Sequence, residues 1–363
     1  MFYQKIIRPI LFKVDPEKIH HLVMGALSLV SRINFFNFII KSNLKVVDSS
    51  LIVKIGELTF ANPVGLAAGF DKNISAPLAY SMLGFGFAEL GSLTYEPQTG
   101  NKKPRLWRLP KDKSLIVYYG LANKGIKSAV DKIKNFKTSN FPFGVSIAPT
   151  TGLSIDQMSD DYLRSFEAIF PYADYVTLNV SCPNVANCDL FTQVDFIKDL
   201  IKKVNNLKNK LNSTVDIFLK IGPDMTILQY DEIVDSCIES GISAMIVTNL
   251  IKDRTNLKSA SLSQDLNHPG GISGYLLKNK STEIIKHIYK RSNGRLKIIG
   301  VGGVFNAKDA YEKIRSGASA VQLITGFIYN GPAAIANINR GLVDLLKKDN
   351  FKNISEAVGV DVC

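Results

Sequence analysis

The run Ala173-Asp-Tyr-Val-Thr-Leu-Asn-Val-Ser-Cys-Pro-Asn184 carries the pattern that decides the fold. Tyr175–Leu178 is a short apolar segment of strand type, and polar side chains begin directly after it. An amphipathic segment of helical period, Asp195–Leu207, follows. A buried strand, a polar turn and an amphipathic helix together make one βα unit of a parallel sheet.

The same rhythm extends in both directions from this unit. Eight strands are predicted: Val64–Ala67, Phe87–Leu90, Phe143–Ile147, Tyr175–Leu178, Ile217–Lys220, Ala244–Val247, Lys297–Gly300 and Ala320–Leu323. Further helices are predicted at Leu228–Ser240, Leu276–Arg291 and Ala307–Ser316, and a hairpin at Val53–Ile55 and Leu58–Phe60. Eight βα units predict an α/β fold, the (β/α)8 TIM barrel. Two longer connections, about Thr94–Leu121 and Ile251–Ser273, are expected to be functional, since long loops in compact domains usually are.

A different pattern precedes the barrel. Asp15 suits the N-cap and Pro16 the first turn of a helix over residues 15–30, whose apolar face needs a partner surface. That face comprises Ile19, Leu22, Val23, Ala26, Leu27 and Val30. Apolar residues on either side, around Ile6 and Phe38, are interspersed with basic ones, which suits either helices on a membrane surface or helices that merely cap the barrel. We therefore divide the chain into a small N-terminal helical extension (1–45, membrane-associating), a barrel (46–350) and a C-terminal tail (351–363).

Composition narrows the class of protein. The chain has 363 residues, 46% of them hydrophobic, so it can bury one large core. A net charge of +12 suits nucleic acid, an acidic lipid surface or a phosphate-bearing ligand, or simply a solvated basic surface. Cys182, Cys188, Cys237 and Cys363 lack C-x2-C spacing, so reduced thiols and no metal are predicted. No apolar run reaches the ~20 residues that span a bilayer, and no signal peptide is expected.

The residues that follow the strands form the active site of a TIM barrel. Gly302 and Gly303 after the seventh strand, with Thr325 and Gly326 after the eighth, offer backbone N–H groups to a phosphate. Taken alone, the glycine run is explained equally well by a tight turn. Lys220 ends the fifth strand and needs an anion or an electron-rich ring, such as a reduced flavin, because an unpaired buried ammonium is costly.

Cys182 stands between Asn179 and Asn184, just past the fourth strand. A thiol can take a proton from a weakly acidic C–H where its surroundings favour the thiolate. Asparagines donate and accept hydrogen bonds, which suits a ligand with amide and carbonyl groups. A buried, inert cysteine is the alternative. We interpret Cys182 as a general base and Cys188 as incidental.

Taken together, these motifs resemble the dihydroorotate dehydrogenases, the FMN-dependent enzymes of pyrimidine synthesis, over nearly the whole chain. FxxDPExxH (Phe12–His20), NPVGLAAGFDKN (Asn62–Asn73), KPRLWRL (Lys103–Leu109) and STEII…GRLKIIGVGG (Ser281–Gly303) are similar to the class 2 branch, which is membrane-associated and quinone-dependent. The resemblance implies that the C5 proton of dihydroorotate passes to Cys182 and the C6 hydride to flavin N5, giving orotate. A quinone then reoxidises the flavin through a tunnel under the N-terminal helices.

The resemblance also implies site residues and partners. Cofactor-binding positions are matched by Ala68, Gly69, Phe70, Asp71, Lys72, Ser92, Ser146, Asn179, Lys220, Thr248, Gly274, Gly303, Ile324 and Thr325. Substrate-binding positions are matched by Lys72, Gly120, Leu121, Asn179, Asn184 and Asn249, and the quinone tunnel by His20 and Arg108. Peripheral attachment to the cytoplasmic side of the cell (inner) membrane is implied, and nucleic acid is not expected as a partner.

Three positions depart from the family pattern. Class 2 enzymes usually carry serine as the base, whereas Cys182 is like the soluble class 1 enzymes. Val117 stands where the family typically has a substrate-binding asparagine, and Leu250 where class 2 often has a hydroxyl side chain.

Alternative functions remain at this point. Fumarate or NAD could serve as the electron acceptor. A tRNA-dihydrouridine synthase is also an FMN barrel with an Asn-x-x-Cys-Pro signature, but it would need an RNA-binding helical domain after the barrel. The third alternative is a non-catalytic, membrane-bound barrel.

Overall fold

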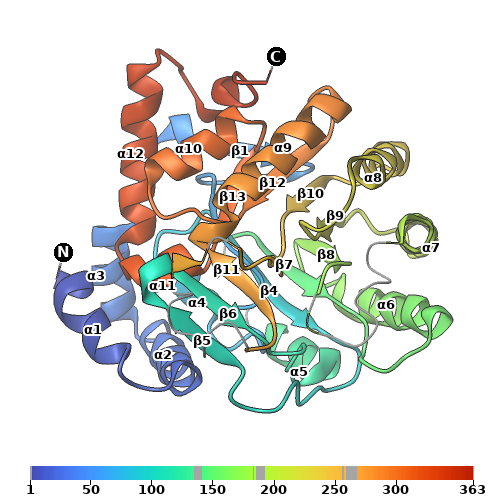
Figure 1. Ribbon diagram of the computed structural model, residues 1–363, viewed down its shortest axis with the longest axis horizontal. Coiled ribbons are helices and arrows are strands. Elements are labelled where there is room, and N and C mark those ends of the chain that lie inside the picture. Colours follow the sequence, from blue (N-terminus) through green and yellow to red (C-terminus); the bar gives the residue numbers. More distant parts are fainter. Residues whose placement is uncertain are drawn as a thin grey trace.

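Eight parallel strands close into a barrel surrounded by helices (Figure 1). The computed structural model describes residues 2–134, 141–182, 184, 193–255, 257, 258 and 268–362. The barrel strands are β3 (Val64–Leu66), β4 (Phe87–Leu93), β7 (Phe143–Ile147), β8 (Tyr175–Asn179), β9 (Asp216–Ile221), β10 (Ala244–Val247), β12 (Lys297–Val301) and β13 (Ala320–Leu323). The last strand pairs with the first, Val321 opposite Val64, and this pairing closes the ring. The predicted TIM barrel is confirmed, and all eight predicted strands form.

Helices cover the outside of the barrel, and their local sequences explain where several of them begin. α6 and α8 each start at a capping box, in which Ser154 or Thr226 exchanges hydrogen bonds with a glutamine three residues later. The helices after β3 are α4 (Pro77–Met82), α5 (Gly125–Ile133), α6 (Ile155–Ile169), α7 (Val194–Lys210), α8 (Ile227–Glu239), α9 (Lys278–Ser292), α10 (Ala307–Arg315), α11 (Thr325–Asn330) and α12 (Ala334–Lys348). The four barrel helices predicted from sequence are confirmed within three residues at each end.

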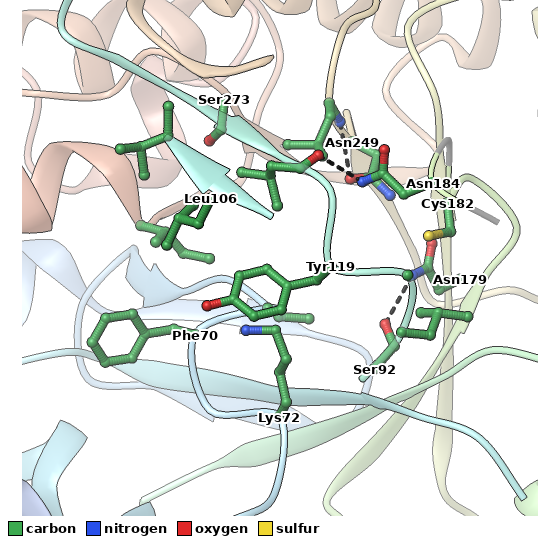
Figure 2. Close-up of a pocket in the computed structure, with 18 of the residues that line it drawn as sticks. Phe70, Lys72, Ser92, Leu106, Tyr119, Asn179, Cys182, Asn184, Asn249 and Ser273 are labelled. Atoms are coloured by element: carbon green, nitrogen blue, oxygen red, sulfur yellow. Dashed lines mark hydrogen bonds between the residues drawn. The ribbon is translucent and has the colours of Figure 1, made fainter. Parts of the chain in front are cut away.

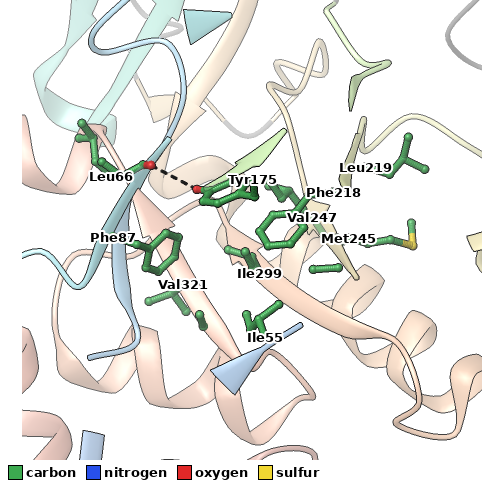
Figure 3. Close-up of a cluster of buried hydrophobic side chains, with 14 of the residues drawn as sticks. Ile55, Leu66, Phe87, Tyr175, Phe218, Leu219, Met245, Val247, Ile299 and Val321 are labelled. Carbon is green, nitrogen blue, oxygen red and sulfur yellow. Dashed lines mark hydrogen bonds between the residues drawn. The ribbon is translucent and has the colours of Figure 1, made fainter. Parts of the chain in front are cut away.

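Large rings packed against glycines fill the barrel interior (Figure 3). A Cβ on Gly144 would lie 2.0 Å from the ring of Tyr175, and one on Gly65 would lie 2.4 Å from Phe87. Tyr175 stacks on Phe218 with 4.3 Å between ring centroids, and its hydroxyl donates to a backbone carbonyl at 3.2 Å. The interior is therefore a packed core, and ligands can enter only at its ends.

A hairpin closes the end of the barrel where the strands begin. β1 (Val53–Ile55) and β2 (Leu58–Phe60) pair as predicted, with the turn at Gly56-Glu57. Phe60 of β2 stacks on Phe87 at 4.1 Å, and the Glu57 N–H donates to the Asp216 carboxylate at 3.0 Å. The opposite end of the barrel is left for ligands.

A three-stranded antiparallel sheet lies beside that open end (Figure 1). β5 (Leu106–Leu109), β6 (Ser114–Val117) and β11 (Gly271–Gly274) come from the two long connections. Hydrogen bonds join it to the α11 region, because the Tyr329 hydroxyl donates to Ser114 O and the Ser273 and Thr325 hydroxyls lie 2.8 Å apart. The two segments expected to be functional loops thus form one cover for the barrel mouth.

The N-terminal segment packs against the last barrel unit. It contains the π-helix η1 (Tyr3–Ile7), α1 (Arg8–Leu11), α2 (Pro16–Val30), α3 (Asn34–Leu44) and the 3-10 turn η2 (Ser49–Leu51). The Tyr3 hydroxyl donates to Ile328 O at 2.7 Å and Arg8 donates to Tyr329 O at 3.0 Å. Within the described ranges, none of the helices has the length and apolar character needed to cross a membrane.

Helix α2 begins where it was predicted to begin, but the side through which it packs differs from the predicted apolar face. The Asp15 side chain accepts from the Lys18 N–H at 2.8 Å, as an N-cap does. Leu22 was expected on the packed face and is 66% exposed, whereas Met24, outside the predicted stripe, is buried. The prediction for Leu22 is wrong because α2 packs through the side that carries Glu17 and Met24, which a purely apolar stripe does not reveal.

Candidate active site

A pocket opens at the barrel mouth, where the carboxyl ends of the strands meet (Figure 2). Most of the residues predicted for flavin, substrate and proton transfer lie around it. These are Ala68, Gly69, Phe70, Lys72, Ser92, Gly120, Leu121, Asn179, Cys182, Asn184, Lys220, Asn249 and Ile324, and His20, which was predicted for the quinone tunnel, also lines the pocket. Tyr119, Leu106 and Ser273, which were not predicted, also line it.

A chain of hydrogen bonds crosses the wall of the pocket. Asn249 donates to the backbone and hydroxyl of Ser181, at 2.9 and 3.1 Å, and the Ser181 hydroxyl donates to Asn179 at 2.8 Å. The Asn179 amide donates to the Ser92 hydroxyl at 2.8 Å, which in turn lies 2.7 Å from the Ser146 hydroxyl (Figure 2). Ser146 is fully buried behind Ser92, so it orients a pocket residue instead of lining the pocket. Sequence reasoning missed Ser181, although it lies inside the quoted run.

Asn184 lines the pocket and carries a buried polar atom that is unpaired among the described residues. Its Nδ2 donates to the Val117 backbone carbonyl at 2.9 Å, while its buried Oδ1 has no hydrogen-bond partner among the described residues. Val117 therefore contributes to the pocket by holding the Asn184 side chain through its backbone carbonyl. An orphaned buried acceptor costs free energy unless a ligand donor meets it.

Cys182 lies beside these asparagines in the pocket wall (Figure 2). It is 8% exposed, so its sulfur is sheltered from bulk water but faces the ligand space. Cys237 of α8 is the matched contrast: it lies in the core away from the pocket, where burial raises the pKa of its thiol. Cys188 and Cys363 lie outside the described residues.

Lys72 enters the pocket from a loop that Asp71 holds in shape. The Asp71 carboxylate accepts from the backbone N–H groups of Ser75 and Ala76 and from the Tyr80 hydroxyl, each at 2.8 to 2.9 Å. Asp71 was predicted to bind the cofactor, but its carboxylate forms these hydrogen bonds within the loop. The Lys72 ammonium lies 3.8 Å from the centre of the Tyr119 ring (Figure 2), and burial lowers the pKa of Lys72 to about 8.

A buried polar layer lies beneath the pocket. The Lys220 ammonium is 3.6 Å from the Glu89 carboxylate, which also accepts from Thr177 at 3.1 Å and Gln322 at 3.3 Å. Both charged side chains are at most 5% exposed, so Lys220 does not reach solvent and the anion it needs is partly supplied by the protein. Glu89 was missed, although an acidic residue within a predicted buried strand is itself a signal for a buried cation.

A second cavity shares walls with the pocket and has the features of a phosphate cradle. It is lined by the predicted residues Thr248, Gly274, Gly303 and Thr325, and by Ala68, Lys220, Asn249 and Ile324 in common with the pocket. Gly303 has φ +71°, and a Cβ there would lie 2.4 Å from the Lys278 Cβ. Only glycine permits this close backbone approach, so the residues present fit a bound phosphate group.

A buried lysine braces this cradle from behind. Lys313 has no exposed surface, and its ammonium donates to Lys278 O, the Ser281 hydroxyl and the Thr282 hydroxyl at 2.9 to 3.2 Å. Ser281 in turn donates to Val301 O at 2.6 Å, directly before Gly302. The start of α9 is thereby fixed against the end of β12.

A third, apolar cavity lies between the barrel and the N-terminal helices. His20 and Arg108 both line it, together with Tyr3, Leu11, Phe12 and Val23. His20 and Phe70 also line the reaction pocket, so the two cavities meet there. Burial, with the nearby Lys72 charge, lowers the pKa of His20 to about 3, and the Arg108 guanidinium donates to Val14 O at 2.6 Å.

The fold and the site define a class of protein, a (β/α)8 barrel with a polar pocket at its mouth and a glycine-lined cavity beside that pocket. The family model "Dihydroorotate dehydrogenase" matches residues 50–346. Named "Dihydroorotate dehydrogenase (quinone)", a relative from Christiangramia forsetii is 40% identical over 94% of this chain and 99% of its own, and one from Gloeobacter violaceus is 38% identical over 98% of each. The solved structure of ligand-free DHODH from Eimeria tenella matches with TM-score 0.86 and 32% identity, covering 96% of this chain and 99% of that one.

This chain belongs to the dihydroorotate dehydrogenase family. The predicted family is confirmed, and its quinone-dependent class 2 branch is the one that the relatives named above represent.

Proposed function

We propose that this chain oxidises dihydroorotate to orotate in pyrimidine biosynthesis, with FMN as its cofactor and a quinone as its electron acceptor. The observation that carries the proposal is a polar reaction pocket that shares walls with a glycine-lined cradle and, separately, with an apolar cavity. An FMN phosphate in the cradle would place the isoalloxazine ring toward the pocket, where Ala68, Lys220 and Ile324 line both spaces. Bound there, FMN supplies the acceptor for the C6 hydride of the substrate.

The residues of the pocket wall divide the remaining tasks. Cys182, as thiolate, takes the proton from C5 of dihydroorotate and becomes a neutral thiol. The Asn184 Oδ1 accepts from a substrate N–H, and Asn179 and Asn249, held by Ser181, complete the amide contacts. The Lys72 ammonium meets the substrate carboxylate. Water is kept from the reacting atoms because Cys182, Asn179 and Asn184 are all at most 8% exposed.

Orotate binding should weaken as pH rises through about 8. Below pH 8 the Lys72 ammonium is charged and attracts the orotate carboxylate; above it the group is neutral and this attraction is lost. We expect the dissociation constant, measured by the change in flavin absorbance on adding orotate, to rise about tenfold between pH 7 and pH 9.5. Lys72→Arg keeps a cation across this range, so its dissociation constant should stay flat. A wild-type constant that does not change with pH would contradict the role of Lys72.

The acceptor side is assigned to the apolar cavity under α1 and α2. His20 stays neutral at physiological pH because its pKa is far below 7, so it adds no charge to the wall that a quinone would contact. Large apolar side chains on the outside of the same segment are exposed and would face a lipid surface. They are Phe2 (67%), Ile10 (62%), Leu22 (66%), Leu29 (64%), Phe35 (67%) and Phe38 (74%). We infer peripheral attachment at the cytoplasmic face of the membrane through these residues.

Steady-state turnover of dihydroorotate with a quinone, fumarate or NAD as acceptor tests this function. The quinone should support turnover at least ~100-fold faster than the other two, because an apolar acceptor matches the apolar cavity between the barrel and the N-terminal helices. Arg108→Gln should slow quinone reduction and leave anaerobic flavin reduction by dihydroorotate unchanged. Turnover with fumarate alone would overturn the assigned acceptor, and no reduction of FMN by dihydroorotate would overturn the function.

A further inference from the structure

A buried ion pair joins the N-terminal helix α2 to the chain that borders the pocket. Arg105, just before β5, donates to both carboxylate oxygens of Glu17 at 2.8 and 3.3 Å. The two side chains are 9% and 8% exposed. Burial would raise the pKa of Glu17, but hydrogen bonds from Arg105 and Lys103 outweigh it and hold that pKa below its usual value. The pair is therefore charged on both sides.

The same guanidinium also holds a loop. Its Nη1 donates to Thr99 O at 2.7 Å and to Asn101 O at 3.0 Å. Its Cζ lies 5.0 Å from the centre of the Tyr119 ring, which the Lys72 ammonium also contacts. Because Arg105 has a rigid, planar fork of donors, fixing it through Glu17 fixes where these two carbonyl groups lie.

Asn101 carries the connection into the pocket. Its Nδ2 donates to Tyr118 O at 3.1 Å and to Asn184 O at 3.0 Å. Asn184 is bonded on its other side to Val117 O, and its Oδ1 remains unpaired among the described residues. Hydrogen bonds thus lead from Glu17 in the N-terminal segment through Arg105 and Asn101 to the backbone carbonyl of Asn184, the residue whose side chain accepts from the substrate in the proposed function.

We propose that Glu17, Arg105 and Asn101 are positioning residues for substrate binding, acting through Asn184. The inference rests on the proposed function, in which Asn184 binds dihydroorotate and orotate. It gives the N-terminal segment a second task beside lining the acceptor cavity: α2 holds the substrate half of the active site in shape. A pair that merely fastened α2 would affect stability and quinone reduction but not affinity for orotate.

Glu17→Gln tests the proposal on the full-length holoenzyme. The variant keeps the size of the side chain and removes the charge that orients Arg105. We expect the KM for dihydroorotate and the dissociation constant of orotate to rise about tenfold, while FMN content and kcat at saturating dihydroorotate stay within about threefold. Lys103→Gln is the matched control, since Lys103 also contacts Glu17, at 3.3 Å, but is 63% exposed and bonds to none of the loop carbonyls above. It should leave both quantities unchanged.

Asn101→Leu tests the second half of the connection without touching the ion pair, and it decides the matter if Glu17→Gln fails to fold. It should weaken orotate binding about tenfold as well, with flavin retained. If the wild-type enzyme oxidises dihydroorotate and both folded variants bind orotate as tightly as it does, the positioning role is overturned while the proposed function stands. If the wild-type enzyme does not oxidise dihydroorotate, it is the function that fails.

Discussion

Replacing Cys182 with alanine should slow reduction of the bound flavin by dihydroorotate about a thousandfold, since a positioned general base contributes roughly 10²–10⁴ to a rate. The thiol lines the pocket together with Asn179 and Asn184, and in the proposed function it is the group that takes the C5 proton. The measurement is the anaerobic rate of flavin bleaching after rapid mixing with saturating dihydroorotate. FMN content should be unchanged, because Cys182 does not line the phosphate cradle.

Two further variants serve as controls for the Cys182→Ala result. Cys237→Ala removes the other described free thiol, which is buried in α8, and should leave the rate within about threefold. Cys182→Ser should retain part of the activity and need a higher pH to reach it, because a hydroxyl loses its proton less readily than a thiol. A Cys182→Ala enzyme that reduces its flavin at the wild-type rate would remove Cys182 from the mechanism.

Gly303→Ala should weaken FMN binding by at least ~100-fold. The added Cβ would lie 2.4 Å from Lys278 Cβ and 2.6 Å from its Cα, and the helix that carries Lys278 is braced by Lys313 and cannot easily move. The loop itself must therefore shift out of the position in which its N–H groups meet a phosphate. Equilibrium titration of the apoprotein with FMN, followed by quenching of flavin fluorescence, measures the loss.

Gly241→Ala controls for backbone strain in this experiment. Gly241 has φ +67°, close to the +71° of Gly303, but nothing lies within 4 Å of a Cβ built on it. Both variants place an alanine in the left-handed backbone conformation, which is strained. Only in Gly303→Ala does the added Cβ also clash with a neighbouring residue at the cradle. Equal FMN affinity in the two variants would contradict the assignment of Gly303 to the phosphate site.

The barrel could be predicted because its pattern is local. The strand, turn and helix of each βα unit are encoded within about thirty consecutive residues. The residues that follow the strands then lie together at the barrel mouth once the ring closes. The cover sheet could not be predicted in this way, because β5, β6 and β11 come from two connections more than a hundred residues apart. β5 and β6 form a hairpin within one connection, but nothing in either connection specifies that β11 pairs with β6.

The residues of the candidate site could likewise be predicted where the signal is local in sequence, and not where it depends on distant partners. Motifs and position predicted Cys182, the asparagines and the glycines as site residues, and the structure places them around the pocket and the cradle. Glu89 and Ser181 were missed because their roles depend on partners that other strands bring to them. Leu22 was misplaced because the packed side of α2 is organised by the charge of Glu17 as much as by apolar residues. Interactions between charged groups that are far apart in the sequence produce no periodic pattern from which they could be predicted.

The closure of the barrel by β3 and β13 also bears on how the chain folds. The strand pairing of Val64 with Val321 and the hydrogen bond from the Tyr3 hydroxyl to Ile328 O can form only after residues 321–328 have left the ribosome. Contacts this far apart in sequence form slowly, so the apolar faces of the first helices remain uncovered throughout synthesis. The N-terminal helices therefore reach their native place late, and during that interval their apolar side chains could be covered by a chaperone or a lipid surface.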